Sequence, residues 1–312
     1  MRILLAGATG AVGRPLVRQL AAAGHQVLAI TRSAGKSASL TEAGADAIVC
    51  DVYDRDRLVG LARDLAPEAV IHQLTDLPPA MDPGKIAEIY ERNNRVRREG
   101  TRNLLDAAAA AGAARFIVQS MGTWYEPIGG PIKAETDALW VNASEPLGTA
   151  VRTVDEMERA VLREAGVGIV LRYGAFYGPG TWYAADGEIA RRMRSRGFPI
   201  IGRGEGIMSF IHVDDAASAA VAVLAAPAST IYNVADDEPA PGAVWTPAYA
   251  EAIGAPKPFS VPAFAARLAL GSTLTEWLTT MRGASNAKIK TELPWTPRFP
   301  SWRDGFRTLE RP

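Results

Sequence analysis

The stretch Ile3–Gly13, ILLAGATGAVG, decides the fold of this chain. An apolar run, Ile3–Ala6, ends at a G-x-x-G-x-x-G spacing formed by Gly7, Gly10 and Gly13. A buried strand that passes through a glycine turn into a helix offers free N–H groups and the positive end of the helix dipole to a pyrophosphate. The stretch therefore predicts a dinucleotide-binding turn, made by Gly7, Thr9, Gly10, Ala11, Val12 and Gly13.

Short apolar runs continue to alternate with helical patterns through the first half of the chain. Strands are expected at Ile3–Ala6, Gln26–Thr31, Ala47–Cys50, Ala69–Gln73, Phe116–Ser120 and Val167–Arg172. Helices are expected at Val12–Ala23, Thr101–Ala111 and Val154–Ala165. This alternation predicts an α/β fold in which a doubly wound parallel sheet, of the Rossmann type, is covered by helices on both faces.

The composition of the sequence changes after residue 172, where aromatic residues, prolines and glycines become frequent. We expect a dinucleotide-binding domain over residues 1–172, to which residues 208–235 return. Residues 173–207 and 236–312 should form a smaller substrate-binding lobe over the strand ends, where ligands of such sheets bind.

Charge and composition exclude several classes of partner. With 34 basic and 34 acidic residues the formal net charge is zero, so we expect neither nucleic acid nor a membrane surface as partner, only a small-molecule substrate. The basic stretch Arg92, Arg95, Arg97, Arg98 and Arg102 is interleaved with acidic residues and predicts a solvated, ion-paired helix face. The lone cysteine, Cys50, excludes an internal disulfide and suits a cytoplasmic location.

The residues after the second strand distinguish between the two nicotinamide dinucleotides. An acidic residue there would bind the ribose 2′-hydroxyl of NAD, but the chain has Arg32 and Ser33, with Lys36 close behind. A guanidinium can pair with a 2′-phosphate, so the sequence favours NADP(H) over NAD(H). Further cofactor contacts are expected from Asp51 and Val52 after the third strand and from Gln73, Leu74 and Thr75 at the fourth.

A series of motifs spans nearly the whole chain. They are GATGAVG at Gly7–Gly13, AVIHQLT at Ala69–Thr75, EGTRNLLDAA at Glu99–Ala108, LRYGAFYGPGT at Leu171–Thr181, FIHVDDAA at Phe210–Ala217, YNVADDEP at Tyr232–Pro239 and SNAKIKTELPWTPRFPSW at Ser285–Trp302. With these motifs the chain resembles the extended short-chain dehydrogenase/reductase family, of the NAD-dependent epimerase/dehydratase type. The resemblance implies a nicotinamide cofactor and a C-terminal substrate lobe, and it makes a homodimer an expectation, because relatives pair through a helix bundle.

The chain departs from the resembled family at the catalytic relay. The family motif S-[ST]-x-x-V-Y-G after the fifth strand corresponds here to Ser120–Tyr125, SMGTWY, which puts Met121 at the hydroxyl position. The family Y-x-x-x-K is followed by a glutamate four residues after the lysine; aligned on Glu158, Ala150 and Val154 take the two positions. Aligned on Glu156, the two positions fall on Gly148 and Arg152, and no Y-x-x-x-K occurs anywhere in the chain.

The resemblance implies that the absent lysine would lower the tyrosine pKa and hold the nicotinamide ribose, while the tyrosine would exchange a proton with the substrate. Without an acid–base group a carbonyl reduction loses about 10²- to 10⁴-fold in rate. Replacement catalytic groups are sought at the end of the fifth strand, in Tyr125, Thr123 and Ser120. Aromatic residues are expected to bind the substrate: Trp124, Tyr173, Tyr177, Trp182 and Tyr183.

The sequence thus predicts an atypical NADP(H)-dependent oxidoreductase that reduces a carbonyl, imine or activated C=C of a small apolar or aromatic molecule, as in secondary metabolism. Two alternatives remain open. One is a non-redox cyclase, isomerase or dehydratase on the same scaffold, and the other is a catalytically inactive protein that binds NADP(H) or a ligand. His72 and His212 are interpreted as structural, and no residue spacing indicates a metal site.

Overall fold

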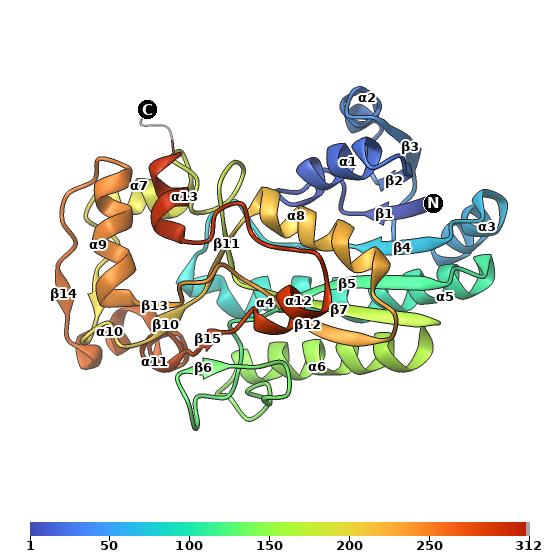
Figure 1. The fold of residues 1–312 in the computed structure, drawn as a ribbon. Helices are drawn as coiled ribbons and strands as arrows, with labels where there is room; N and C mark the ends of the chain where they lie inside the picture. Colours follow the sequence, from blue (N-terminus) through green and yellow to red (C-terminus); the bar gives the residue numbers. More distant parts are fainter. Residues whose placement is uncertain (310–312) are drawn as a thin grey trace.

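A seven-stranded parallel sheet forms the centre of the computed structural model, which describes residues 1–309 (Figure 1). In chain order the strands are β1 (Arg2–Ala6), β2 (Gln26–Thr31), β3 (Ala45–Val49), β4 (Ala69–His72), β5 (Arg115–Met121), β7 (Val167–Tyr173) and β12 (Thr230–Val234). Their order across the sheet is β12-β7-β5-β4-β1-β2-β3, so the winding reverses beside β1. The predicted doubly wound parallel sheet is confirmed, and its switch point, where such folds bind ligands, lies between β1 and β4.

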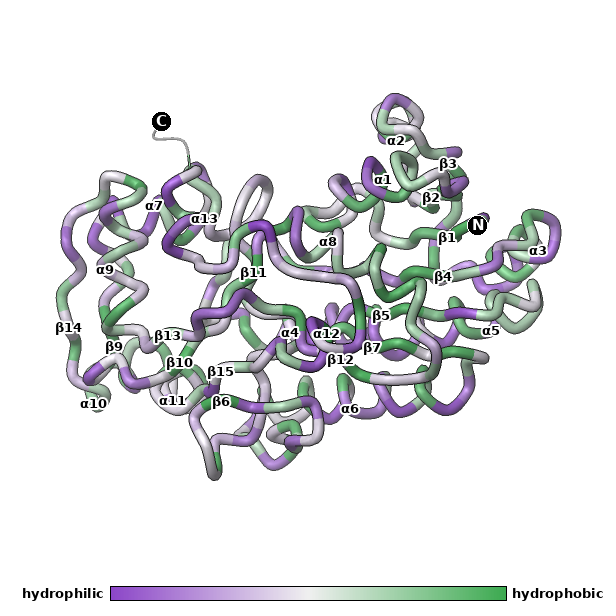
Figure 2. Tube along the Cα trace, viewed as in Figure 1, coloured by the Kyte–Doolittle hydropathy of each residue, from purple (hydrophilic) through white to green (hydrophobic). Residues whose placement is uncertain are grey.

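Helices cover both faces of the sheet. One face carries α1 (Gly13–Ala22), α2 (Ser37–Glu42) and α8 (Val213–Ala222), and the other carries α3 (Arg55–Leu65), α5 (Thr101–Ala111) and α6 (Leu147–Glu164) (Figure 1). Each face has its own buried apolar cluster. The inner strands are hydrophobic along most of their length (Figure 2), as expected for a sheet that is buried on both sides.

The helix before α5 is interrupted by a π turn. Helix α4 (Ile86–Arg95) continues into this turn, η3 (Val96–Gly100), and then into α5. Such turns rotate the following side chains relative to a regular helix and are frequent at functional sites. The remaining short helical turns are η1 (Ala34–Lys36), η2 (Pro83–Lys85) and η4 (Val223–Ala225).

A second group of elements lies beside the C-terminal edge of the sheet, to the left in Figure 1. Its helices are α7 (Glu188–Arg194), α9 (Gly242–Ala252), α10 (Ala263–Leu270), α11 (Ser272–Thr280) and α13 (Trp302–Arg307). Its short strand pairs are β8 (Ala175–Tyr177) with β11 (Phe210–His212), β9 (Ile200–Ile201) with β14 (Ser260–Val261), and β10 (Ile207–Met208) with β13 (Ala240–Pro241). Below the sheet, β6 (Ile132–Lys133) pairs with β15 (Gly283–Ala284), followed by α12 (Ala287–Glu292).

Most expected elements are present, and their ends differ from the prediction in two informative places. Strand β2 and helix α5 match their predicted bounds, whereas β3 begins at Ala45, directly after Gly44 with its left-handed φ of +95°. Helix α6 begins at Leu147 instead of Val154, because Leu147, Ala150 and Val151 bury one apolar face against the residues after β5. The domain boundary at residue 172 stays a prediction. Within residues 1–309 no helix is both long and apolar enough to cross a bilayer.

Candidate active site

The three glycines of the turn have different steric surroundings, and each lacks a side chain for a different reason. Gly7 has a φ of +96°, and a Cβ there would lie 2.6 Å from the backbone of Gln73, so it is confined by the end of β4. A Cβ on Gly13 would lie 2.1 Å from the carbonyl oxygen of Gly7, so helix and strand pack here through backbone alone. A Cβ on Gly10 would meet only the Gly7 oxygen, at 3.3 Å, and would otherwise point into open space. The missing side chain at Gly10 therefore leaves room for a ligand, whereas at Gly7 and Gly13 it is required by the packing of the fold.

The ligand side of this turn is also polar. Helix α1 has no capping side chain, and no hydrogen bond from the backbone N–H groups of Ala11, Val12 and Gly13 is found in residues 1–309, which leaves these groups available to a pyrophosphate. At the end of β4, buried Gln73 has an Oε1 atom without a hydrogen-bond partner in residues 1–309. Across the turn, a methyl group on Gly180 would lie 3.8 Å from the Cβ of Ala11, so the loop after β8 borders the turn from the lobe side. The N–H groups fit the pyrophosphate of a dinucleotide between β1, β4 and this loop, and the Gln73 Oε1 atom, an acceptor, fits a ribose hydroxyl.

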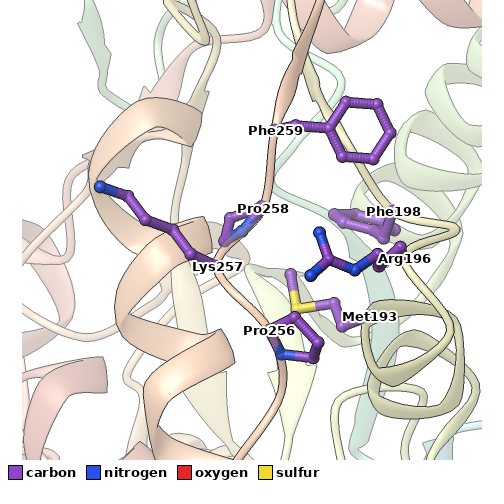
Figure 3. Close-up of a pocket in the computed structure, with 7 residues that line it drawn as sticks. All are labelled: Met193, Arg196, Phe198, Pro256, Lys257, Pro258 and Phe259. Atoms are coloured by element: carbon purple, nitrogen blue, oxygen red, sulfur yellow. The ribbon is translucent and has the colours of Figure 1, made fainter.

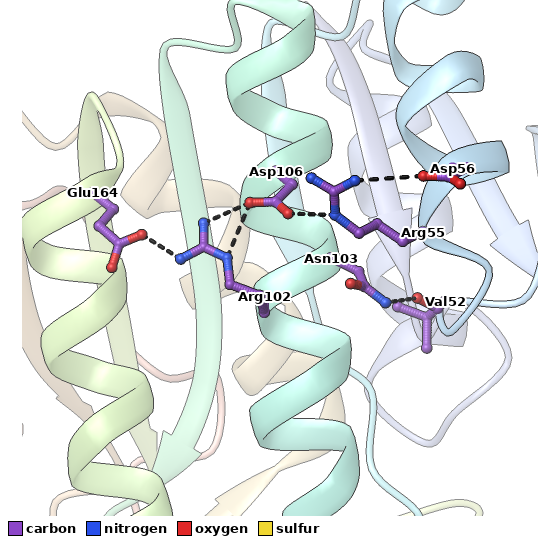
Figure 4. A network of polar contacts seen from close by, with 7 residues as sticks. All are labelled: Val52, Arg55, Asp56, Arg102, Asn103, Asp106 and Glu164. Atoms are coloured by element: carbon purple, nitrogen blue, oxygen red, sulfur yellow. Dashed lines mark hydrogen bonds and ion pairs between the residues drawn. The ribbon is translucent and has the colours of Figure 1, made fainter.

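The predicted adenine end lies at the ends of β2 and β3. Arg32 is exposed, and no hydrogen bond or ion pair of its guanidinium is found among the described residues. Ser33 and Lys36 follow in the turn η1, and the Asp51 carboxylate accepts a hydrogen bond from the backbone of Tyr53 at 3.0 Å. The carbonyl oxygen of Val52 accepts a hydrogen bond from the Asn103 amide at 2.9 Å (Figure 4).

A network of ion pairs joins α3, α5 and α6 beside Val52 and Asn103. Asp106 accepts from Arg55 at 2.7 Å and pairs with Arg102 at 2.8 Å, and Arg102 reaches Glu164 (Figure 4). The predicted ion-paired face of the basic stretch is confirmed for Arg102 and for three further arginines, whose pairs are Arg92–Asp76, Arg95–Glu99 and Arg98–Glu91. The fifth, Arg97, was predicted wrongly, since it is buried.

The positions of the absent relay form an apolar cluster at the end of β5. Ala150 and Val154 are buried on α6, and Met121 packs against the same cluster from β5. Trp124 and Tyr125 belong to it as well. The site therefore has apolar side chains without an acid–base group at all three positions from which the resembled enzymes supply a proton relay.

Two of the three predicted catalytic groups are instead part of a buried polar network. The Ser120 hydroxyl donates to Glu158, whose carboxylate pairs with Arg172 at 2.6 Å. The Tyr125 hydroxyl donates to Asn233 Oδ1 at 2.5 Å and accepts from Arg172 Nη1 at 3.1 Å. Burial above all raises the pKa of Tyr125 to about 12, although Arg172 opposes this shift.

This placement corrects the expectation for Ser120 and Tyr125. Their side chains are 0% and 1% exposed and their hydroxyl groups already have protein partners, so neither hydroxyl is free in this structure. Thr123 is buried too, and its carbonyl oxygen accepts from Trp277 Nε1 at 3.1 Å, while no hydrogen bond of its hydroxyl is found in residues 1–309. Thr123 stays a candidate.

Three of the aromatic residues expected to bind substrate are packed in the cores. Tyr173 is 1% exposed and donates its hydroxyl to the Ala216 carbonyl at 3.2 Å. Tyr177 and Tyr183 are buried in the core of the lobe, against Phe210. The three rings are enclosed by protein, so in this structure they pack the cores and do not line a pocket.

The other two aromatic candidates lie on the loops that follow β8 and β5, and they stay candidates. Trp182 is half-buried, and its indole N–H donates to the Pro78 carbonyl at 3.1 Å, which ties the lobe to the loop after β4. Trp124 follows β5 and meets Tyr90 of α4 edge-on, with ring centroids 6.1 Å apart. The sequence interpretation missed Tyr90 and Arg97. The signal was available, because Arg97 lies four residues after buried Asn93 and four before buried Thr101, on the inward face of the helix.

The histidines and the cysteine have structural surroundings. His72 Nδ1 accepts from the Leu74 backbone at 3.1 Å, and burial, with a smaller contribution from Arg97, lowers the pKa of His72 to about 3. His212 caps α8 through Asp214 N. Cys50 is buried, and no cluster of metal-ligating side chains occurs within residues 1–309.

A small pocket in the lobe is lined by Met193, Arg196, Phe198 and Pro256–Phe259 (Figure 3). Its volume of about 10 Å³ allows at most one water molecule, so it is not a substrate site. A wide groove of about 770 Å³ beside Met1, His25 and Trp295 lies at the opposite edge of the sheet from the glycine turn.

Comparisons with known proteins agree with this geometry. Residues 3–235 match the NAD dependent epimerase/dehydratase family. The chain belongs to this family. A 3-diazoavenalumate denitrifying reductase from a Streptomyces species is 44% identical over 307 residues, covering 98% of this chain and 99% of that protein. A 2-alkyl-3-oxoalkanoate reductase from Stenotrophomonas maltophilia is 26% identical, covering 82% of this chain and 77% of that protein.

Solved structures of the epimerase/dehydratase family share the fold. UDP-glucose 4-epimerase from Thermotoga maritima, solved with UDP-glucose, has a TM-score of 0.77 at 20% identity, covering 99% of this chain and 97% of that one. Human epimerase family protein SDR39U1, solved with NADPH, has a TM-score of 0.74 at 19% identity, covering 99% of both chains. With its reductase relatives, this family member is an NAD(P)-dependent oxidoreductase, as the sequence predicted.

Proposed function

We propose that the protein is an NADPH-dependent reductase that replaces the diazo group of a small aromatic substrate with hydrogen and releases N₂. One observation carries this proposal: the chain has an intact dinucleotide-binding turn but apolar side chains where the proton-transfer groups would be. These side chains are Met121, Ala150 and Val154. A diazo substrate replaces the carbonyl, imine or activated C=C of the sequence prediction as the first choice.

The argument rests on proton balance. Reduction of a ketone to an alcohol needs a hydride and a proton, and the proton is what the absent tyrosine would provide. Replacement of an aromatic diazonium group, Ar–N₂⁺, by hydrogen needs one hydride and yields Ar–H and N₂, so atoms and charge balance without a proton from the protein. An apolar wall is then no handicap, and it keeps water away from a reactive cation.

The chain's own groups supply the binding of the cofactor. The uncapped start of α1 and the open face of Gly10 would hold the pyrophosphate, and the free Oε1 of Gln73 would accept a hydrogen bond from a ribose hydroxyl. Arg32 supports NADPH over NADH, because a guanidinium at the end of β2 that is exposed and has no ion pair within residues 1–309 suits a 2′-phosphate. When bound, the reduced nicotinamide supplies the hydride.

The relative named as a diazoavenalumate reductase supports the choice of substrate class, since the alignment spans both chains almost completely. The carbonyl reductases among the relatives match over less of the chain and at lower identity. A homodimer and a cytoplasmic location stay predictions.

The test is turnover of purified protein with NADPH and a diazotised aminocinnamate prepared with isotope-labelled nitrite. We expect oxidation of NADPH matched by an equal release of labelled N₂ in a mass spectrometer. The control variant is Gly10→Ala, which adds one methyl group towards the ligand side while the fold offers it only one close contact, at 3.3 Å. This variant should keep the wild-type unfolding temperature and lose turnover.

Other outcomes would contradict the proposal. Faster reduction of a matched aryl ketone would return the assignment to carbonyl chemistry. Tight NADPH binding without oxidation in the presence of either probe would favour the non-redox or the inactive alternative.

A further inference from the structure

Arg97, on the π turn η3, is a buried cation for which the described part of the chain holds no ion-pair partner. Its side chain belongs to a residue that is 4% exposed, and its Nη1 atom has no hydrogen-bond partner within the described part of the chain. No ion pair of Arg97 is found in residues 1–309 either, whereas Arg95 and Arg98 on the same helix are both paired. Burial lowers the pKa of Arg97 to about 10, against the opposing charge of Glu158, so the group is still charged at neutral pH.

The position of Arg97 is fixed by neighbours from separate elements. Its guanidinium carbon lies 5.1 Å from the centre of the Trp124 ring, beside the end of β5. The charge of Arg97 contributes to the lowered pKa of His72 at the end of β4. Tyr90 on α4 acts in turn on Arg97, whose pKa it raises. It thus lies next to the apolar cluster of the absent relay, to which both Trp124 and Tyr90 belong.

An unpaired charge in this position is costly to the fold. A guanidinium removed from water without a carboxylate partner is strongly destabilising, in contrast to Arg172, whose charge is matched by Glu158. Asn94, three residues earlier on the same side of the helix, is also buried with an unpartnered Oδ1. Polar groups that are buried without partners call for an explanation, and a ligand is one.

We propose that Arg97, on η3, binds an anionic oxygen, a carboxylate or phenolate, of the aromatic substrate. This inference rests on the proposed function, from which it takes the location of the substrate. It adds that the substrate carries a negative charge. The oxygen would accept from Nη1 and so provide the missing counter-charge of Arg97. The Trp124 and Tyr90 rings, 6.1 Å apart and perpendicular, form an aromatic corner that suits a flat ring.

The experiment measures binding instead of turnover, using cinnamate and its neutral methyl ester as probes and quenching of tryptophan fluorescence as the signal. NADP⁺ is kept saturating. In Arg97→Met we expect the Kd for cinnamate to rise about 10- to 100-fold, as for the loss of a charge-assisted hydrogen bond. The Kd for methyl cinnamate should change less than about threefold, because the ester has no charge to lose.

Two further variants separate a binding role from a structural one. Arg97→Lys keeps the charge and should restore most of the cinnamate affinity. Arg98→Met removes an equal charge from the adjacent residue, which pairs with Glu91, and should leave both affinities unchanged. The unfolding temperature of Arg97→Met should not fall, since the substitution removes an uncompensated buried charge.

Equal weakening of both probes in Arg97→Met, or no weakening, would overturn the proposal, as would a wild-type protein that does not prefer cinnamate over its ester. These results are independent of diazo chemistry. The protein could fail to turn over the diazonium probe and still bind cinnamate more tightly than its ester in a way that depends on Arg97. That result would refute the proposed function and support the anion site.

Discussion

Replacement of Tyr125 by phenylalanine tests whether this tyrosine supports the fold or the chemistry. Its hydroxyl bridges Asn233 Oδ1, at 2.5 Å, and Arg172 Nη1, at 3.1 Å, in a region without solvent access. Phenylalanine keeps the ring and its packing and removes only these two bonds. We expect a loss of stability with nearly unchanged turnover.

The size of the loss follows from the remaining partners. Arg172 Nη1 keeps a bond to the Glu135 carbonyl at 3.3 Å, whereas no other partner of Asn233 Oδ1 is found in residues 1–309. The buried Asn233 acceptor left unsatisfied costs about 1–3 kcal/mol and the lost bond from Arg172 costs about 1 kcal/mol, so the substitution should cost about 2–4 kcal/mol. With an unfolding entropy of about 2.1 cal/mol/K per residue, this corresponds to a fall in Tm of roughly 3–6 °C for a chain of 312 residues.

The assay pairs thermal unfolding with kcat and KM on the diazotised probe. Tyr53→Phe is the matched control, because no hydrogen bond of the Tyr53 hydroxyl is found within residues 1–309, and it should keep the wild-type Tm. A fall in kcat of about 10²-fold or more with an unchanged Tm would refute the structural role and restore Tyr125 as a proton donor.

Two further predictions concern the cofactor and the response to pH. Arg32→Asp should weaken NADPH binding about 10- to 100-fold and NADH binding far less, measured by calorimetry; equal effects on both would remove Arg32 as the selector. Burial above all raises the pKa of Asp236 from 3.8 to about 8, so the stability of its neutral form is complete below the unfolded pKa and is lost as the pH rises through about 8. Asp236→Asn, neutral at every pH, should therefore gain Tm relative to wild type between pH 5 and pH 9, and a constant difference would contradict this assignment.

The sequence by itself was sufficient for features whose physics is local. The glycine spacing predicts the turn because Gly7 has a left-handed φ of +96° and Gly13 packs against the backbone of Gly7, only six residues before it. The alternation of apolar runs and helical patterns predicts a parallel sheet for the same reason. The absence of the relay also needs no structure, because a chain without any Y-x-x-x-K cannot form one in any alignment.

Only the tertiary structure decided what the individual side chains face. Tyr125 and Asn233 are 108 residues apart in the chain, so no local pattern could indicate that the hydroxyl of one is bound to the amide of the other. The aromatic residues after β7 are equally suited by type to a pocket or a core, and the packing of α13 and α9 around Tyr177 and Tyr183 determined that they form a core. Arg97 was expected among solvated charges, but its turn of the helix faces the sheet. Burial and partners depend on contacts between distant segments, and these exist only once the chain has folded.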